Sequence, residues 1–141
     1  MSITRHSIRH VAFQILFALE SNPDTDINAL YEQLRVDDEK LTLPAVIPPY
    51  LVELTEGVVS HKEELDAVIS SYLSKQWNLK RLTKTDLILL RLAAYEVQDV
   101  ADVPAKVAVD EALQLAREFS DEKSRRFVNG ILSNLIIADE K

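Results

Sequence analysis

Cysteine is absent from the sequence, and glycine occurs only twice among its 141 residues. Without cysteine, the chain cannot form a disulfide scaffold, a thiolate metal site or a cysteine nucleophile. Two glycines, Gly57 and Gly130, are few for a sheet-rich fold with many tight turns. Leu, Ala, Glu and Lys are frequent instead, and these residues favour helices. We therefore expect an all-α fold.

Long apolar runs are also absent. Arg5, His6, Arg9 and His10 interrupt the N-terminal residues, so no signal peptide is visible. The most apolar stretch, residues 84–98, is too short to make a good membrane span. We therefore expect a soluble, cytoplasmic protein with no membrane association.

Acidic residues outnumber basic ones and give the chain a net charge of −7. This balance argues against a strong general nucleic-acid binder, because phosphate contacts supply most non-specific affinity. The charge is uneven, however, since no acid precedes Glu20 and residues 67–85 contain none. The basic residues of these two segments are Arg5 and Arg9, then Lys75, Lys80, Arg81 and Lys84. An RNA-binding role would depend on such local patches or on a basic partner.

Helical periodicity covers most of the chain. Apolar residues that recur at i, i+3 and i+4 predict about seven helices. The predicted ranges are 4–20, 26–35, 48–58, 62–74, 84–98, 104–119 and 122–137. Residues 36–49, with three prolines, are predicted to form a loop. We place a boundary there, between an N-terminal sub-bundle of about residues 1–47 and a C-terminal sub-bundle of about residues 48–141.

The first predicted helix carries a second, aromatic surface. Phe13 and Phe17 lie roughly opposite its core stripe. Either a second sub-bundle covers them, or they form a partner-binding surface beside a strip of Arg and His side chains that meets RNA. His6 and His10 have the i, i+4 spacing of a metal-binding pair, but no third ligand is evident nearby. We expect both histidines to face solvent or RNA.

The last predicted helix begins with basic residues. Arg126 lies there together with Lys123 and Arg125. These side chains either pair with Asp121 and Glu122 on a solvated face or contact a phosphate. Arg126 lies roughly opposite the core stripe of its helix and can therefore face a ligand.

The apolar helix predicted at 84–98 contains one arginine, Arg91, which needs a carboxylate partner if it is buried. The candidate carboxylates are Glu96, Asp110 and Glu111. At the start of the same helix, Thr83 and Asp86 form a plausible capping pair. Asp86 should remain exposed enough to meet a partner, whereas Trp77 is predicted to be a core residue.

No catalytic motif is recognisable. The P-loop, GxGxxG and GxSxG patterns are absent, and none of the three histidines has a recognisable nucleophile nearby. We therefore expect a binding protein and not an enzyme.

A family resemblance is carried mainly by four segments of the C-terminal half. They are LRLAAYE at 90–96, Val103-Pro104, VAVDEA at 107–112 and FVNGIL at 127–132. With these segments in this order, the chain resembles the NusB antitermination family over almost its whole length. The resemblance implies an all-α fold of two packed helical sub-bundles, with no reaction and no cofactor.

The same resemblance implies a function and partners. Members of the family bind boxA, an element of nascent ribosomal RNA, together with the ribosomal protein NusE. That pair joins RNA polymerase and other Nus factors and suppresses premature, Rho-dependent termination. The family's RNA-binding positions fall on Arg5, His6, Arg9 and Arg126, and its NusE-binding positions fall on Phe17 and Asp86.

The chain departs from the family pattern at its first helix. Ser7 and Ile8 separate Arg5 from Arg9, where many relatives have a denser run of arginine. Phe17 replaces a common tyrosine. With a net charge of −7, we expect weak RNA binding by the chain alone and tighter binding beside NusE.

Two other functions are compatible with the sequence. One is a non-catalytic homodimeric adaptor that uses Phe13 and Phe17 as its interface. The other is the RNA-binding part of a ribosomal RNA cytosine methyltransferase. Such enzymes need a further α/β cofactor-binding domain, and this sequence ends at Lys141 without a glycine-rich cofactor loop.

Overall fold

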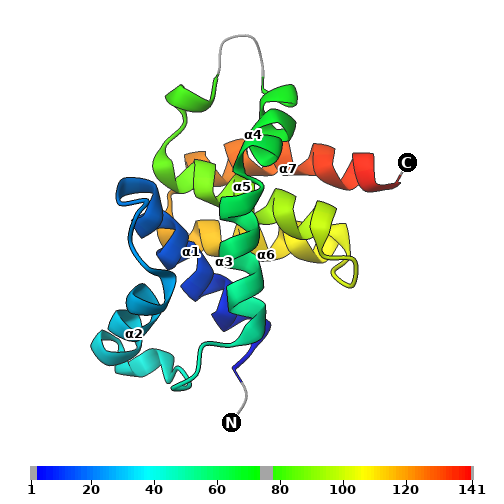
Figure 1. Cartoon of the computed structure of the whole chain (residues 1–141). Coiled ribbons are helices and arrows are strands. Elements are labelled where there is room, and N and C mark those ends of the chain that lie inside the picture. Colours follow the sequence, from blue (N-terminus) through cyan, green and yellow to red (C-terminus); the bar gives the residue numbers. More distant parts are fainter. Residues whose placement is uncertain (1–2, 74–77, 141) are drawn as a thin grey trace. The chain divides into compact units, whose positions relative to one another are not determined.

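The computed structural model describes residues 3–73 and 78–140, and Figure 1 shows the course of their helices. The elements are α1 (Arg5–Ser21), α2 (Ile27–Asp37), η1 (Glu39–Leu41), α3 (Pro49–Ser60), α4 (Lys62–Ser71), η2 (Leu79–Arg81), α5 (Lys84–Asp99), α6 (Ala105–Phe119) and α7 (Glu122–Glu140). The elements labelled η are single 3-10 turns. No strand occurs within the described ranges, and the predicted all-α fold of about seven helices is confirmed.

The chain divides into two compact units, Met1–Gly57 and Val58–Lys141. The first unit holds α1, α2 and most of α3, and the second holds the end of α3 and α4 to α7. Within the first unit α1 packs against α2, and within the second α5 packs against α4, α6 and α7. Each unit thus has its own packed helices.

Side-chain caps determine where several helices begin. Asp26 accepts a hydrogen bond from the backbone N–H of Ala29 at 3.2 Å and starts α2. Thr83 accepts one from the backbone N–H of Asp86 at 3.1 Å and starts α5, as the sequence predicted. Both bonds satisfy backbone donors that a helix leaves unpaired in its first turn.

The segment predicted as a loop, residues 36–49, is only partly irregular. α2 continues to Asp37, and η1 adds a 3-10 turn directly afterwards. The Tyr31 hydroxyl then donates a hydrogen bond to the backbone carbonyl of Pro44 at 2.5 Å. The loop prediction was wrong for most of residues 36–41, because the helix-breaking prolines lie only beyond them.

The apolar stripe of α1 is buried as predicted. Its members are Ile8, Val11, Ala12, Ile15, Leu16 and Leu19. Full burial of a Leu or Ile side chain contributes about 1.5–3 kcal/mol to the free energy of unfolding. This stripe therefore anchors the helix that carries most of the predicted binding residues.

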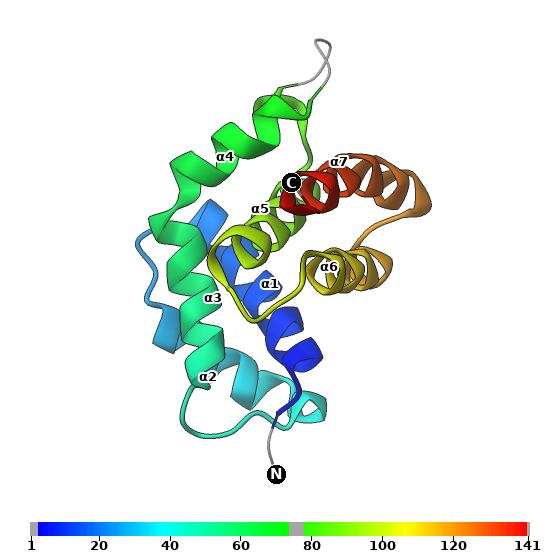
Figure 2. The same ribbon diagram turned by 90° about the vertical axis from the view of Figure 1, so that its right-hand side faces the viewer.

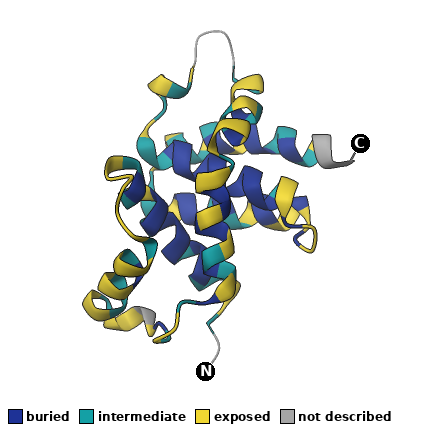
Figure 3. Cartoon of the chain, in the orientation of Figure 1, coloured by how far each residue is buried: buried dark blue, intermediate teal, exposed yellow. Residues whose placement is uncertain are grey.

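α5 is the central helix of the second unit. Residues 87–96 are all buried (Figure 3), and Figure 2 shows α5 beside α6 and α7. Arg91 forms a bidentate ion pair with Asp66 of α4, with Nε–Oδ1 and Nη2–Oδ2 distances of 2.7 and 2.9 Å. Asp66 was not among the candidate carboxylates, since no pattern within one helix identifies which residue of another helix will face it.

Two predictions fall outside the described residues, namely Trp77 as a core residue and Lys75 in the basic segment. Tyr95 is buried, and its ring centroid lies 5.8 Å from that of His61. Among the helices that the structure describes, none has the length and apolar character needed to cross a membrane.

Candidate nucleic-acid interface

The N-terminal turn of α1 presents Arg5 and His6. Thr4 caps this turn by accepting a hydrogen bond from the backbone N–H of Ser7 at 3.1 Å. Arg5 is the first helical residue and is exposed, and His6 is partly exposed. The Arg5 guanidinium carbon lies 4.3 Å from the centroid of the Tyr50 ring. Arg5 and His6 are thus accessible cationic or titratable groups at one end of the helix.

Arg9, one turn further along α1, is buried with an exposed fraction of 3%. The helical spacing placed it between the core stripe and the aromatic line, on a strip expected to meet phosphate. The structure corrects the expected accessibility, and Arg9 interacts within the chain. A buried guanidinium needs such compensation because its desolvation is costly.

The aromatic line of α1 is divided between a buried and an open residue. Phe13 is 3% exposed, whereas Phe17 is 36% exposed. Their ring centroids lie 5.9 Å apart at an interplanar angle of 36°. Phe17 is therefore the member of the pair that a partner protein could contact, with Phe13 supporting it from beneath.

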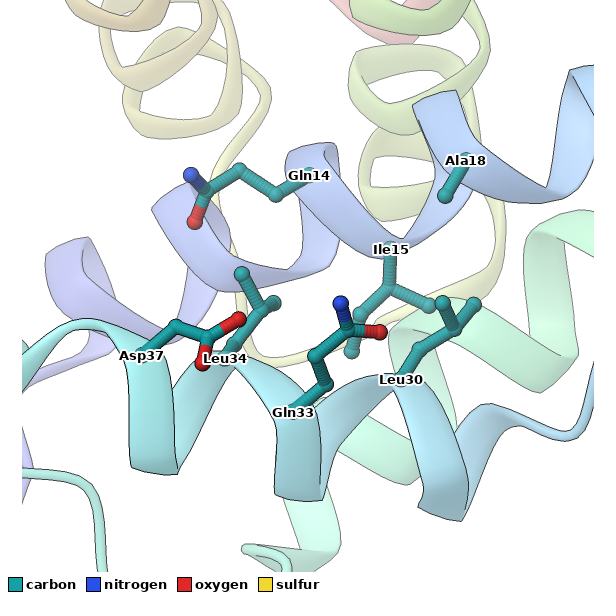
Figure 4. Close-up of a pocket in the computed structure, with 7 residues that line it drawn as sticks. All are labelled: Gln14, Ile15, Ala18, Leu30, Gln33, Leu34 and Asp37. Carbon is teal, nitrogen blue, oxygen red and sulfur yellow. The ribbon is translucent and has the colours of Figure 1, made fainter.

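A groove between α1 and α2 was not anticipated from the sequence. It has a volume of about 210 Å³, and Figure 4 shows the side chains that line it. They are Gln14, Ile15, Ala18, Leu30, Gln33, Leu34 and Asp37. The Gln14 side-chain oxygen is buried and has no hydrogen-bond partner among the described residues. In the sequence, Gln14 is a polar residue beside the core stripe of α1, and this position could have indicated the groove.

Asp86 lies in the first turn of α5 and is buried, with an exposed fraction of 5%. The expectation that it stays exposed was wrong, because the start of α7 covers it: Ser124 Oγ donates a hydrogen bond to its Oδ2 at 3.4 Å. Its Oδ1 has no partner among the described residues. Burial raises the pKa of Asp86 and the charge of Asp121 raises it further, against the lowering effect of hydrogen bonds with Ser124 and Thr83.

Arg126 lines a groove between α6 and α7 of about 260 Å³. The other lining residues are Leu113, Arg117, Glu122, Arg125 and Asn129. Asp121, a predicted ion-pair partner, caps α7 by accepting a hydrogen bond from the backbone N–H of Ser124 at 2.8 Å. The groove thus gathers three guanidinium groups, one amide and the carboxylate of Glu122. The excess of positive charge suits a phosphate-sized anion.

The six predicted binding residues are distributed over both compact units. The first unit contains Arg5, His6, Arg9 and Phe17, and the second contains Asp86 and Arg126. Arg5 and His6 are accessible at one end of α1, and Phe17 lies three turns further along the same helix. Among the described residues there is no group of three or more His, Cys, Asp or Glu side chains that could hold a metal ion.

Sequence comparisons reveal close relatives. A model of the NusB family matches residues 6–136 of the chain. The transcription antitermination protein NusB of Levilactobacillus brevis is 53% identical over 136 residues, which cover 96% of this chain and 94% of that protein. The protein of the same name from Lactiplantibacillus plantarum is 54% identical and is covered to 96%.

Solved structures with the same architecture include T. maritima NusB. It is 32% identical, has a TM-score of 0.80, and the match covers 97% of this chain and 93% of that one. Another is a chain in the crystal structure of the antitermination factors NusB and NusE in complex with dsRNA. It is 25% identical, with a TM-score of 0.78 and coverage of 95% and 96%.

Proposed function

The chain belongs to the NusB family, and on this premise we propose that it is a transcription antitermination factor. In this role it binds boxA-type single-stranded RNA of nascent ribosomal RNA transcripts together with the ribosomal protein NusE. The complex joins RNA polymerase and other Nus factors and suppresses premature, Rho-dependent termination. The chain acts by binding alone, without a reaction or a cofactor. The family match over residues 6–136 carries this proposal.

The residues proposed to bind RNA are basic side chains in each of the two units. Arg5 and His6 are accessible on α1, and Arg126 lies in the α6–α7 groove beside Arg117 and Arg125. The net charge of −7 argues against general binding of nucleic acid. Phosphate contacts are local, however, so clusters of basic side chains can bind RNA on an acidic protein. Arg9 belongs to the proposed set as well, but direct contact with RNA requires its buried side chain to turn outwards.

The residues proposed to bind NusE are Phe17 in the first unit and Asp86 in the second. An exposed aromatic ring supplies apolar contact area, and such residues often dominate binding energy at protein interfaces. Asp86 Oδ1 can accept a hydrogen bond that no described residue of the chain supplies. Because the start of α7 covers Asp86, NusE could satisfy this acceptor only after that segment moves aside. NusE bound next to the RNA would add phosphate contacts.

The test is a titration of fluorescently labelled single-stranded boxA RNA, with and without NusE, at two salt concentrations. The double variant Arg5→Ala/Arg9→Ala and the single variant Arg126→Ala are measured beside the wild type. Arg35→Ala is the matched control, because it removes the same charge from a partly exposed residue of α2 that pairs with Glu32.

We expect salt-sensitive binding that NusE tightens and that both test variants weaken, while the control binds like the wild type. Each phosphate contact that is lost lowers the salt dependence of binding to single strands by about 0.7 in slope. Absence of RNA binding by the folded wild type in all conditions would overturn the proposal.

A homodimeric adaptor is the second candidate function, and the exposure of Phe17 favours it. In that case Phe17 would contact a second copy of the chain. Sedimentation velocity over a concentration series distinguishes the two functions, because a stable dimer that excludes both RNA and NusE is incompatible with the first.

A further inference from the structure

Arg5 and Tyr50 form a cation–π pair within the first unit. The guanidinium carbon lies 4.3 Å from the centroid of the ring, within the distance at which such pairs attract. The two residues are 45 positions apart in the sequence, so the fold of the unit brings them together. Arg5 is exposed and Tyr50 is partly buried. Neighbouring residues therefore restrain the ring, while the guanidinium remains accessible to solvent.

The backbone around Tyr50 is fixed on both sides. Pro49 begins α3 immediately before it, and a proline in the first turn has the backbone angle that a helix requires. The carbonyl of Pro48 accepts hydrogen bonds from the N–H groups of Leu51 and Val52 at 3.0 and 3.2 Å. Leu51, directly after Tyr50, is fully buried. The aromatic ring is therefore attached to an anchored turn.

The dipole of its own helix does not stabilise the Arg5 cation. Arg5 occupies the first position of α1, where the positive end of the helix dipole disfavours a cation. A long side chain there would otherwise populate many rotamers, and fixing it on RNA would cost conformational entropy. The Tyr50 ring offsets both effects, because its negative face attracts the guanidinium and restricts its orientation.

We propose that Tyr50 is a positioning residue of the RNA-binding surface, which holds the Arg5 guanidinium ready for a phosphate group of single-stranded RNA. The inference rests on the proposed function and adds to it a residue that carries no charge. Tyr50 acts through Arg5, so its contribution to RNA affinity disappears when Arg5 is absent.

The experiment is a double-mutant cycle on RNA affinity. Tyr50→Phe, Tyr50→Leu, Arg5→Ala and the Arg5→Ala/Tyr50→Leu combination are titrated with the labelled boxA RNA in the presence of NusE at several salt concentrations. Tyr72→Leu, at a partly buried tyrosine of the second unit, is the matched control. Urea unfolding of each variant reports any loss of stability.

We expect Tyr50→Leu to weaken binding about threefold, the factor that an exposed cation–π pair provides. Its salt slope should fall toward that of Arg5→Ala, by up to about 0.7 for one phosphate contact. Tyr50→Phe keeps the ring and should bind like the wild type, as should Tyr72→Leu. In the Arg5→Ala background, Tyr50→Leu should cause no further loss.

Three results would overturn the inference while leaving the proposed function intact. They are wild-type affinity of Tyr50→Leu, equal weakening by Tyr50→Phe, and a further loss when Tyr50→Leu is added to Arg5→Ala. The last result would also reveal a purely structural effect of Tyr50→Leu. Both variants in that comparison carry Arg5→Ala, so the difference between them cannot come from Arg5. If the wild type binds no RNA even with NusE, the inference and the proposed function fail together.

Discussion

Arg91 and Arg5 show two ways of holding a guanidinium group, one in each unit. Arg91 is 4% exposed and its charge is neutralised by Asp66 in a bidentate pair. Arg5 is exposed and lies over the Tyr50 ring, which orients the cation without cancelling its charge. Burial demands a carboxylate because an unpaired charge is costly to desolvate. An aromatic ring, unlike a carboxylate, adds no opposite charge to the cation that it holds.

The largest effect is expected from removing the carboxylate of the buried pair. Asp66→Asn removes this counter-charge from the buried Arg91 guanidinium, and we expect the free energy of unfolding to fall by about 3 kcal/mol. Urea unfolding measures the loss. RNA affinity of the folded variant should be unchanged. A loss below about 0.5 kcal/mol, the usual range of surface substitutions, would mean that Arg91 does not depend on this carboxylate.

Arg5→Ala should give the opposite pattern. The loss of one exposed cation–π pair lowers the free energy of unfolding by about 0.5 kcal/mol. RNA affinity should fall several-fold and become less dependent on salt, because a phosphate contact is lost. Fluorescence titration and urea unfolding of the same preparation separate the two quantities. A variant that loses stability but retains its RNA affinity would make Arg5 a structural residue like Arg91.

Asp86 adds a carboxylate to this comparison of charged groups. It is buried, as Arg91 is, but no described arginine forms an ion pair with it. Its pKa is raised above the ordinary value of 3.8, chiefly by burial. The native state therefore binds the proton more tightly than the unfolded state, and the free energy of unfolding falls as pH rises through this range. Relative to Asp86→Asn, the wild type should lose stability between pH 3 and pH 7.

Thermal unfolding of both proteins over that pH series checks the prediction. The control is Asp110→Asn, at an exposed residue of α6, whose stability should run parallel to that of the wild type. If the wild type instead gained stability relative to Asp86→Asn as pH rises, the carboxyl would be stabilised in its charged form.

The smallest effect is expected at the solvent-accessible pair of Arg35 and Glu32 on α2. Their side chains are hydrogen-bonded one turn apart, which lowers the pKa of Glu32. Water screens such pairs, and their contribution to stability is small. Glu32→Gln should therefore leave both the unfolding midpoint and RNA affinity unchanged within error. A clear shift in either quantity would show that exposure alone does not decide how strongly an arginine is held.

Features that depend on local spacing could be predicted from the sequence. The apolar stripe of α1, the buried character of α5 and the Thr83 cap all follow from residues three or four positions apart. The Arg91–Asp66 and Arg5–Tyr50 pairs could not be predicted in this way. Each joins two elements, and no periodic pattern within one helix reveals which residue of another helix will face it.

Accessibility was the weakest part of the site prediction. Arg9 and Asp86 carry charges at positions that a helical wheel or a helix start suggests are open, yet both are buried. A wheel describes one isolated helix, whereas Asp86 is covered by Ser124 of α7. Phe13 and Phe17 were both placed opposite the core stripe, and only Phe17 is exposed. The choice of Phe17 as the NusE contact came from the family resemblance and stays a prediction.

The hydrogen bond between the Tyr31 hydroxyl and the Pro44 carbonyl has a consequence for proteolysis. It closes a 13-residue span that contains the tryptic sites Arg35 and Lys40. A protease binds its substrate as an extended chain, so this segment must unfold locally before it can be cleaved. Tyr31→Phe removes the hydrogen bond and should therefore speed tryptic cleavage at these sites. Burial raises the pKa of Tyr31 above its ordinary value of 10.0, and the hydroxyl is therefore a proton donor at neutral pH and well above it. We therefore expect this one hydrogen bond to limit the rate at which trypsin cleaves the segment.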